Sequence, residues 1–281
     1  MRSSALALFG LVTACGVAAT PPPVAPVDLP AARPAASASA APVVPDGYVH
    51  FAHVAPKPGV RYRVDTAAGS RYDELQGEFA GATYHADYTA TLLEVSGDAP
   101  TKLEASFHES VRRVLGAEEY NEKPTGLKGR TIVVQAPGKV DAKDGAPLTA
   151  DQTSHALYVF GDLGLRSRTS AALPDAPVKI GASVDPFAEA VVRSLNAVSW
   201  TPVRTSAVVT ALRDGVATIA LDLEASTASG MHLDAKGTAE VIAQSRVVRA
   251  LVLEGTFRGP PPDRAPGKWD LVRRVAVDPT E

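Results

Sequence analysis

Strict alternation between apolar and polar side chains constrains the fold of this chain more than any other feature. It is clearest from Thr83 to Leu92, where even positions are apolar or aromatic and odd positions are polar. Successive residues of a strand point to opposite faces, so a period of two predicts a half-buried antiparallel strand. The same rhythm recurs in four other segments: 101–111, 217–223, 231–241 and 269–277.

Turn sequences divide the C-terminal third into a meander of five strands. Arg213-Asp214-Gly215 and Ser229-Gly230 are turn signals between consecutive alternating runs. The predicted strands are 203–212, 216–225, 231–244, 247–257 and 269–277. We therefore expect a mostly β (α+β) fold, a long-stranded curved antiparallel sheet or incomplete barrel with two short helices. A two-layer β-sandwich is the alternative. The predicted domain is 47–281, with two weakly similar halves at about 47–145 and 175–281.

One hairpin can be predicted in register. The phase of the alternation flips at Leu92-Leu93, which suggests a β-bulge with both leucines opposite Leu103. This register pairs Tyr88 with Phe107 on the core face, where an aromatic pair contributes roughly 0.2–1 kcal/mol. It also pairs Asp87 with His108 on the outer face.

Two helices are predicted between the halves. Thr149 followed by Gln152 matches a capping box, and an apolar face follows it up to Phe160. Asp185-Pro186 gives an N-cap followed by a proline at the first helical position. Phe187, Val191, Leu195 and Val198 then fall on one stripe of that second helix. Both helices are expected to cover an open end or face of the sheet.

The predicted inner face supplies the candidate ligand-binding residues Tyr84, Tyr88, Phe107 and Glu109. The phase of the strand places Glu109 with Phe107 and Val111 on that face. Burial of an unpaired carboxylate is costly, so Glu109 should pair with an arginine or line a water-filled cavity. The alternative is a bulge that exposes it. A large apolar cavity around these side chains would indicate a carrier of a hydrophobic ligand.

The N-terminus carries a targeting signal. Arg2 precedes a short apolar run that ends in Val12-Thr13-Ala14-Cys15, and Cys15 is the single cysteine. This resembles a bacterial lipobox, which implies a signal peptide at 1–14, cleavage before Cys15 and lipidation of that residue. The Ala/Pro-rich segment 15–46 is then a disordered tether. Gly16 after the cysteine implies the outer membrane, facing the periplasm, with the bilayer as a partner.

The globular part also shows a weak resemblance. Val178-Lys179-Ile180-Gly181-Ala182-Ser183 resembles a segment of an uncharacterised family of exported bacterial β-rich domains. In that family an aspartate and a tryptophan stand where Ala182 and Val184 stand here. The expected half-open barrel with a helical lid also looks like the lipoprotein carriers of Gram-negative envelopes, which hold acyl chains.

Charge and motifs exclude several functions. The net charge is −3 and the basic clusters are only Arg112-Arg113 and Arg273-Arg274, so no nucleic-acid partner is expected. Catalytic signatures are absent from the sequence, and we predict neither an enzyme nor a cofactor. His50, His53 and Asp46 are too few ligands for a predicted zinc site.

Three hypotheses remain: an envelope lipoprotein that binds a protein partner or has a structural role, a carrier or sensor of a hydrophobic ligand on the concave face, and a hydrolase with an unrecognised site.

Overall fold

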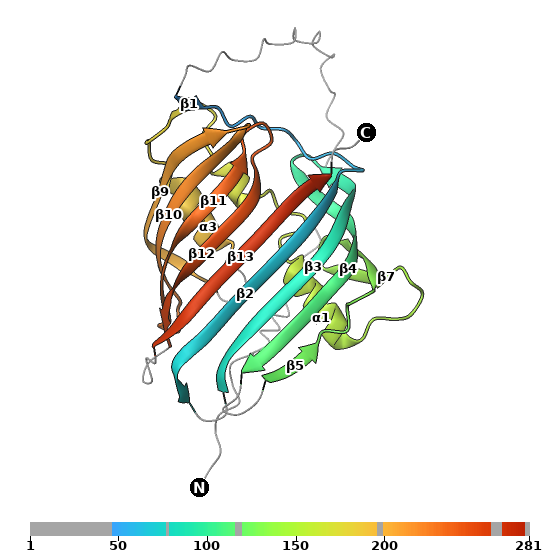
Figure 1. Ribbon diagram of the computed structural model, residues 1–281. Helices are drawn as coiled ribbons and strands as arrows, with labels where there is room; N and C mark the ends of the chain where they lie inside the picture. Colours follow the sequence, from blue (N-terminus) through green and yellow to red (C-terminus); the bar gives the residue numbers. More distant parts are fainter. Residues whose placement is uncertain (1–46, 77–78, 116–119, 196–198, 260–265, 279–281) are drawn as a thin grey trace, which may run out of the picture. The chain divides into compact units, whose positions relative to one another are not determined.

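The protein is built on one large antiparallel sheet, as predicted (Figure 1). The computed structural model describes residues 47–76, 79–115, 120–195, 199–259 and 266–278. Within them, eleven strands form this sheet. Ten of them follow the order β7-β6-β4-β3-β2-β13-β12-β11-β10-β9, and the eleventh, β5, pairs with β4 beside this path. In this described part the end strands β7 and β9 do not pair with each other, so the sheet curves without closing into a barrel. It is not a sandwich of two layers.

The strands are long in both halves. Those of the first half are β2 (Arg61–Gln76), β3 (Phe79–Ser96), β4 (Ala99–Leu115), β5 (Tyr120–Pro124), β6 (Thr131–Gln135) and β7 (Lys139–Ala142). Those of the second half are β9 (Thr201–Arg213), β10 (Val216–Ser226), β11 (His232–Ile242), β12 (Val247–Arg258) and β13 (Pro266–Asp278). The five predicted C-terminal strands are thus confirmed. Two further short strands, β1 (Tyr48–Val49) and β8 (Val178–Lys179), form a separate pair.

The two halves meet where the last strand pairs with the first long one. β13 and β2 are antiparallel and pair without a register shift from Gly267 opposite Tyr72 to Asp278 opposite Arg61. This pairing joins residues about 200 positions apart, a costly loop closure that must be offset by the packing it creates. Without this seam the molecule would contain two smaller sheets.

Helices α1 (Ala150–Val159) and α3 (Asp185–Arg193) lie on the same side of the sheet (Figure 1). The capping box between Thr149 and Gln152 is present. The N-cap of α3 is Val184 rather than the predicted Asp185, because the carboxylate of Asp185 accepts a hydrogen bond from the Ala207 N–H of β9 instead. A third helix, α2 (Arg168–Ala171), was not predicted. Among the described residues, no helix is both long enough and apolar enough to cross a membrane.

The interior consists of two separate hydrophobic cores. The first contains Tyr88 and Phe107 of the sheet and Ala156 of α1. The second contains Phe187 and Val191 of α3, packed against β9 to β12. Each core also contains residues from the opposite end of the described chain. The C-terminal strand β13 contributes Val275 to the first core, whereas the N-terminal residues Val49 and Phe51 belong to the second.

The β3–β4 hairpin follows the predicted register up to a second bulge. Leu92 pairs with Leu103 past an extra residue, Leu93, and Tyr88 pairs with Phe107, so both predictions are confirmed. The predicted pairing of Asp87 with His108 is wrong. The register shifts between Asp87 and Tyr88, which leaves His108 as an extra residue and sets Glu109 opposite Asp87. From this bulge onward the faces of β4 are inverted.

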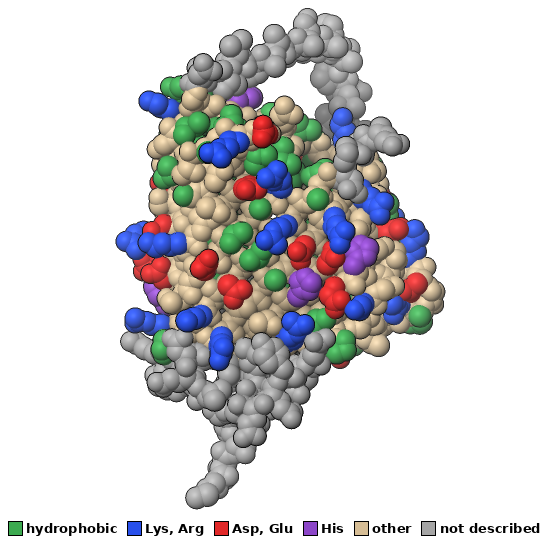
Figure 2. All heavy atoms as spheres, in the orientation of Figure 1, with side chains coloured by type: hydrophobic (Ala, Val, Ile, Leu, Met, Phe, Trp, Pro, Cys, Tyr) green, Lys and Arg blue, Asp and Glu red, His purple; other side chains and the backbone are tan. Residues whose placement is uncertain are grey.

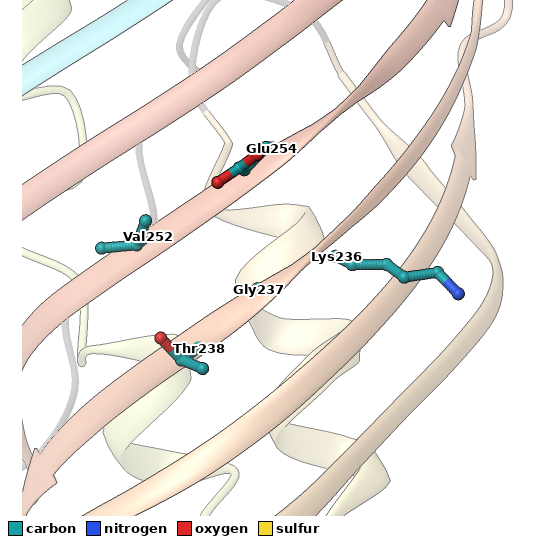
Figure 3. A pocket seen from close by; sticks show the side chains of 5 residues that line it. All are labelled: Lys236, Gly237, Thr238, Val252 and Glu254. Atoms are coloured by element: carbon teal, nitrogen blue, oxygen red, sulfur yellow. The ribbon is translucent and has the colours of Figure 1, made fainter.

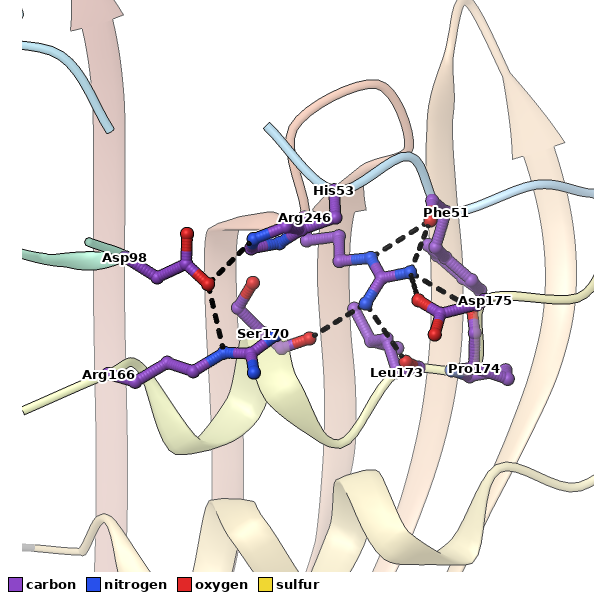
Figure 4. Close-up of polar contacts among 9 residues, drawn as sticks. All are labelled: Phe51, His53, Asp98, Arg166, Ser170, Leu173, Pro174, Asp175 and Arg246. Carbon is purple, nitrogen blue, oxygen red and sulfur yellow. Dashed lines mark hydrogen bonds and ion pairs between the residues drawn. The ribbon is translucent and has the colours of Figure 1, made fainter. Parts of the chain in front are cut away.

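Arg246 ties one end of the sheet together (Figure 4). Its side chain is 3% exposed, in the turn between β11 and β12. The guanidinium donates to the carbonyls of Phe51 and Leu173 at 2.7 and 3.1 Å, and to the carboxylate of Asp175. Its backbone adopts a φ of +57°, a conformation that is uncommon for a non-glycine residue.

We name residues 47–60, which Arg246 holds, the N-terminal strap. This segment contacts both halves of the molecule. Its contacts are Tyr48 and Val49 with β8, Ala52 N–H with the Ala243 carbonyl, His53 with Asp98 at 3.1 Å, and Gly59 N–H with the Leu92 carbonyl. The strap therefore bridges the second half to the first at this end of the sheet.

Replacement of Arg246 by alanine should lower the free energy of unfolding by about 2–4 kcal/mol, since it leaves buried carbonyls unpaired. Asp214 offers the matched control, because it also has a positive φ of 49° but is exposed. D214A should lower the free energy of unfolding by less than about 1 kcal/mol. Urea unfolding followed by circular dichroism measures both. Equal small losses would show that the guanidinium does not hold the strap.

Candidate functional site

The inner face of the sheet, on the helix side, is left partly open between the two cores. We call this area the central strip. It comprises Thr66, Ala68 and Ser70 of β2, Ala82 and Tyr84 of β3, and Trp269, Leu271 and Arg273 of β13. Alternation places them on the same face as the buried Val64, Ala86 and Val275. All eight are partly or fully exposed, whereas their neighbours toward the strap are buried.

The floor of the strip is made of small side chains. In the register of the sheet, Ala68 lies between Tyr84 and Leu271, and Ser70 lies between Ala82 and Trp269. Small residues therefore lie at the centre, with larger aromatic and aliphatic residues on both sides, and we call this line of small side chains the trough.

Helix α1 borders the strip with His155 and Tyr158, which both contact Tyr84 of β3. The Tyr84 hydroxyl lies 3.1 Å from Nε2 of His155. The rings of Tyr84 and His155 are 5.0 Å apart, and that of Tyr158 stands edge-on to Tyr84 at 5.9 Å. Burial, with a smaller effect from the positive charge of Arg112, lowers the pKa of His155 to about 4. His155 is therefore neutral at physiological pH, and burial raises the pKa of Tyr84, so both of these side chains are uncharged.

Ser110 supports this border from below. The bulge at His108 turns Ser110 to the inner face, where it is fully buried. Its hydroxyl accepts a hydrogen bond from Thr125 at 2.7 Å and is also hydrogen-bonded to Tyr84. A hydroxyl enclosed in this way has no access to a substrate, so the Ser110–Tyr84–His155 chain positions side chains and supplies no exposed nucleophile.

Two of the four predicted ligand-binding residues belong to a packed core. Tyr88 and Phe107 are 5% and 2% exposed, with ring centroids 5.3 Å apart. Phe160, just after α1, stands edge-on to both rings at 5.2 and 6.2 Å. The predicted pairing of these aromatics is correct, but here they close the first core. Of the four residues, only Tyr84 borders the central strip.

Glu109 follows the second of the two alternatives from the sequence, a bulge that moves it away from the inner face. Because of the bulge at His108, Glu109 lies on the outer face with Asp87 instead of on the inner face with Phe107. Lys128 pairs with it at 2.8 Å, and this hydrogen bond lowers the pKa of the Glu109 carboxyl. Figure 2 shows the outer face, where positive and negative side chains are interspersed. Glu109 is one of these surface charges.

Arg273 is the one charged residue on the inner face of β2, β3, β12 and β13, within the side chains that the structure describes. It lies between the partly buried Leu271 and the buried Val275, yet it remains exposed. No carboxylate of the described residues forms an ion pair with it. Prediction from the sequence missed Arg273, although strict alternation through 269–277 identified its face.

A second hollow lies on the outer face, away from the helices (Figure 3). It has a volume of about 370 Å³ and is lined by five residues of β11 and β12: Lys236, Gly237, Thr238, Val252 and Glu254. Lys236 already pairs with Asp222 of β10 at 3.0 Å. The hollow is open and its few polar groups do not converge on a point, so it offers a ligand little enclosure.

Five of the six histidines in the described residues lie apart, each with its own partner. They pair as His53 with Asp98, His85 with Asp65, His108 with Thr89, His155 with Tyr84, and His232 with Glu224. Within the described ranges no three His, Cys, Asp or Glu side chains are grouped to hold a metal ion. Asp46, Cys15 and the predicted tether 15–46 lie outside those ranges, as does most of the Pro-rich loop 259–267.

His155 should make folding stability depend on pH. The unfolded chain protonates this histidine near pH 6.5 and the folded protein only near pH 4. Stability should therefore fall as the pH is lowered through this window and level off below it. The free energy of unfolding should decrease by about 1–2 kcal/mol, a figure that is reduced because His155 is partly exposed to solvent. Urea unfolding at several pH values measures it. H155Q should abolish this contribution, and H232Q should retain it; an unchanged pH profile in H155Q would contradict the assignment.

Comparisons with known proteins give little guidance. No family model matches the chain, and no curated protein matches its sequence. Among solved structures it is similar to a chain from a study of lipid–protein interactions in lipovitellin, with 9% sequence identity and a TM-score of 0.42. The match covers 79% of this chain and 25% of the other, so this chain spans about a quarter of its length. Function must therefore be inferred from the residues of the chain itself.

Proposed function

We propose that the protein is a lipid-anchored lipoprotein of the bacterial envelope whose globular domain binds a hydrophobic ligand without catalysis. The observation that carries the binding role is the central strip. Two separate cores leave a partly exposed apolar trough between them, with Ala68 at its base and Tyr84 and Leu271 on its sides. Exposed apolar surface of this kind on the concave side of a curved sheet is typical of a binding site.

The dimensions of the strip suit an acyl chain. From Thr66 to Ser70 the strip runs for four residues, or about 13 Å at about 3.3 Å per residue. Each methylene buried there contributes roughly 0.8 kcal/mol. The uncharged border of Tyr84 and His155 adds apolar contact and few competing hydrogen bonds. A trough lined in this way favours a flexible hydrocarbon over a polar solute.

The anchor is supported by the N-terminal sequence. Val12-Thr13-Ala14-Cys15 has the order of a lipobox, and the following residues to about 46 are rich in alanine and proline. Lipidation of Cys15 would hold the domain at a bilayer through more than one acyl chain, which stable anchoring requires. We place the protein in the outer membrane, facing the periplasm, on the basis of Gly16.

Ligand binding can be tested by filling the trough. Ala68 and Ala67 are neighbours on β2, but Ala68 faces the central strip and Ala67 faces outward. A68F should weaken the binding of the neutral fluorescent probe N-phenylnaphthylamine by about tenfold or more, since the ring occupies the trough. A67F is the matched control and should bind as the wild type does. Equal binding by both variants, or no binding by the wild type, would contradict the proposal.

The anchor can be tested separately in a Gram-negative host. The wild-type protein should incorporate labelled palmitate and show a lipid mass on its mature N-terminus, whereas C15A should show neither. Globomycin should cause the precursor to accumulate. Intact mass spectrometry gives the readout. Processing that is insensitive to globomycin, with no lipid on the wild-type protein, would exclude the anchor and leave the binding site as a separate question.

A further inference from the structure

We propose that the ligand is an anionic amphiphile, with its hydrocarbon chain along the central strip and its charged group at Arg273. This inference rests on the proposed hydrophobic site and specifies the class of its ligand. The observation that carries it is a single exposed cation within a trough that is otherwise uncharged on β2, β3, β12 and β13, in the part of the chain that is described.

The neighbouring Arg274 shows what is unusual about Arg273. Arg274 points to the outer face, where Asp65 lies 3.8 Å away and charges of both signs are interspersed. Arg273 points inward and lies between Leu251 and Thr66 in the register of the sheet. A cation beside apolar residues, with no anionic partner among the described side chains, is electrostatically complementary to an anionic ligand.

Among the described side chains, Arg112 is a second positive charge near the strip. Arg112 of β4 lies opposite Tyr84, and its positive charge acts on both His155 and Tyr158 of α1. His155 is neutral at physiological pH. The positive charge of Arg112 therefore reaches helix α1 at the border of the strip.

The fold also fixes the direction of the ligand. Toward the strap, the strip ends where Val64 and Val275 are buried in the first core. In the other direction, Leu271 and Trp269 follow Arg273 on the same face and are only partly buried. A ligand held at Arg273 would therefore extend its chain in one direction, along β13 and β2 toward Trp269, over about 13 Å.

The experiment compares palmitate with hexadecanol, which has the same chain and no charge, at about pH 8, where the carboxylate is ionised. Both should displace N-phenylnaphthylamine from the wild-type protein, and palmitate should bind more tightly by about tenfold. R273Q should weaken the binding of palmitate by about tenfold or more and leave the affinity for hexadecanol nearly unchanged. R273K should restore part of the palmitate affinity. R274Q, the matched control on the outer face, should bind both ligands as the wild type does.

The outcomes separate this inference from the function on which it rests. Failure of both ligands to bind the wild-type protein would contradict the hydrophobic site itself. Binding of both with equal affinity, unaffected by R273Q, would overturn the role of Arg273 while the site stands. An equal loss of palmitate affinity in R273Q and R274Q would show a general effect of charge and would also overturn the role of Arg273. Thermal unfolding of each variant confirms that the fold is retained, as the exposure of both arginines leads us to expect.

Discussion

The antiparallel pairing of β2 with β13 is the contact on which the rest of the structure depends. It joins the two halves of the chain into one sheet through twelve consecutive residue pairs. Each half otherwise has its own helix and its own core, α1 with the first and α3 with the second. The seam places the cores side by side and at the same time keeps them apart. The central strip lies on the seam, so the candidate site is a direct result of this pairing.

The width of the sheet explains why this area stays open. Ten strands follow one another along the main path of the sheet. At about 4.8 Å per strand, the path is about 43 Å wide. A helix with its side chains is only about 10 Å across, so α1 and α3 together cover about half of that width. The small residues Ala68 and Ser70 occupy the centre, where the strands remain partly exposed.

The sequence predicts most of the fold because alternation is a local property. All five strands of the C-terminal meander, the capping box of α1 and the pairing of Tyr88 with Phe107 were recognisable from residue types and spacing. The bulge at His108 was not, because one extra residue leaves no mark in the composition of the strand. That single residue moved Glu109 to the outer face and brought Ser110 to the inner one.

The candidate site was predicted less well than the fold. Tyr84 was correctly assigned to the inner face and borders the strip. Tyr88 and Phe107 face inward too, but whether an inward residue is packed or exposed depends on where the helices lie, which local periodicity does not encode. Arg273 was considered only as part of a basic pair with Arg274. Its inward position matters because of the strands on either side of it, and these are set by the long-range pairing of β13 with β2.

The N-terminal strap gives the molecule a mechanical property. If Cys15 is anchored, any pull between the bilayer and the domain reaches the folded part first at residue 47, where the strap begins. The strap is held by two residue pairs between β1 and β8, by the burial of Val49 and Phe51 and by separate hydrogen bonds such as those from Arg246, whereas β2 is held along its length by two long neighbours. Tension should therefore peel the strap away before any strand of the sheet yields. The strap would then act as a sacrificial link, whose release withdraws Val49 and Phe51 from the second core while the long strands of the sheet stay paired.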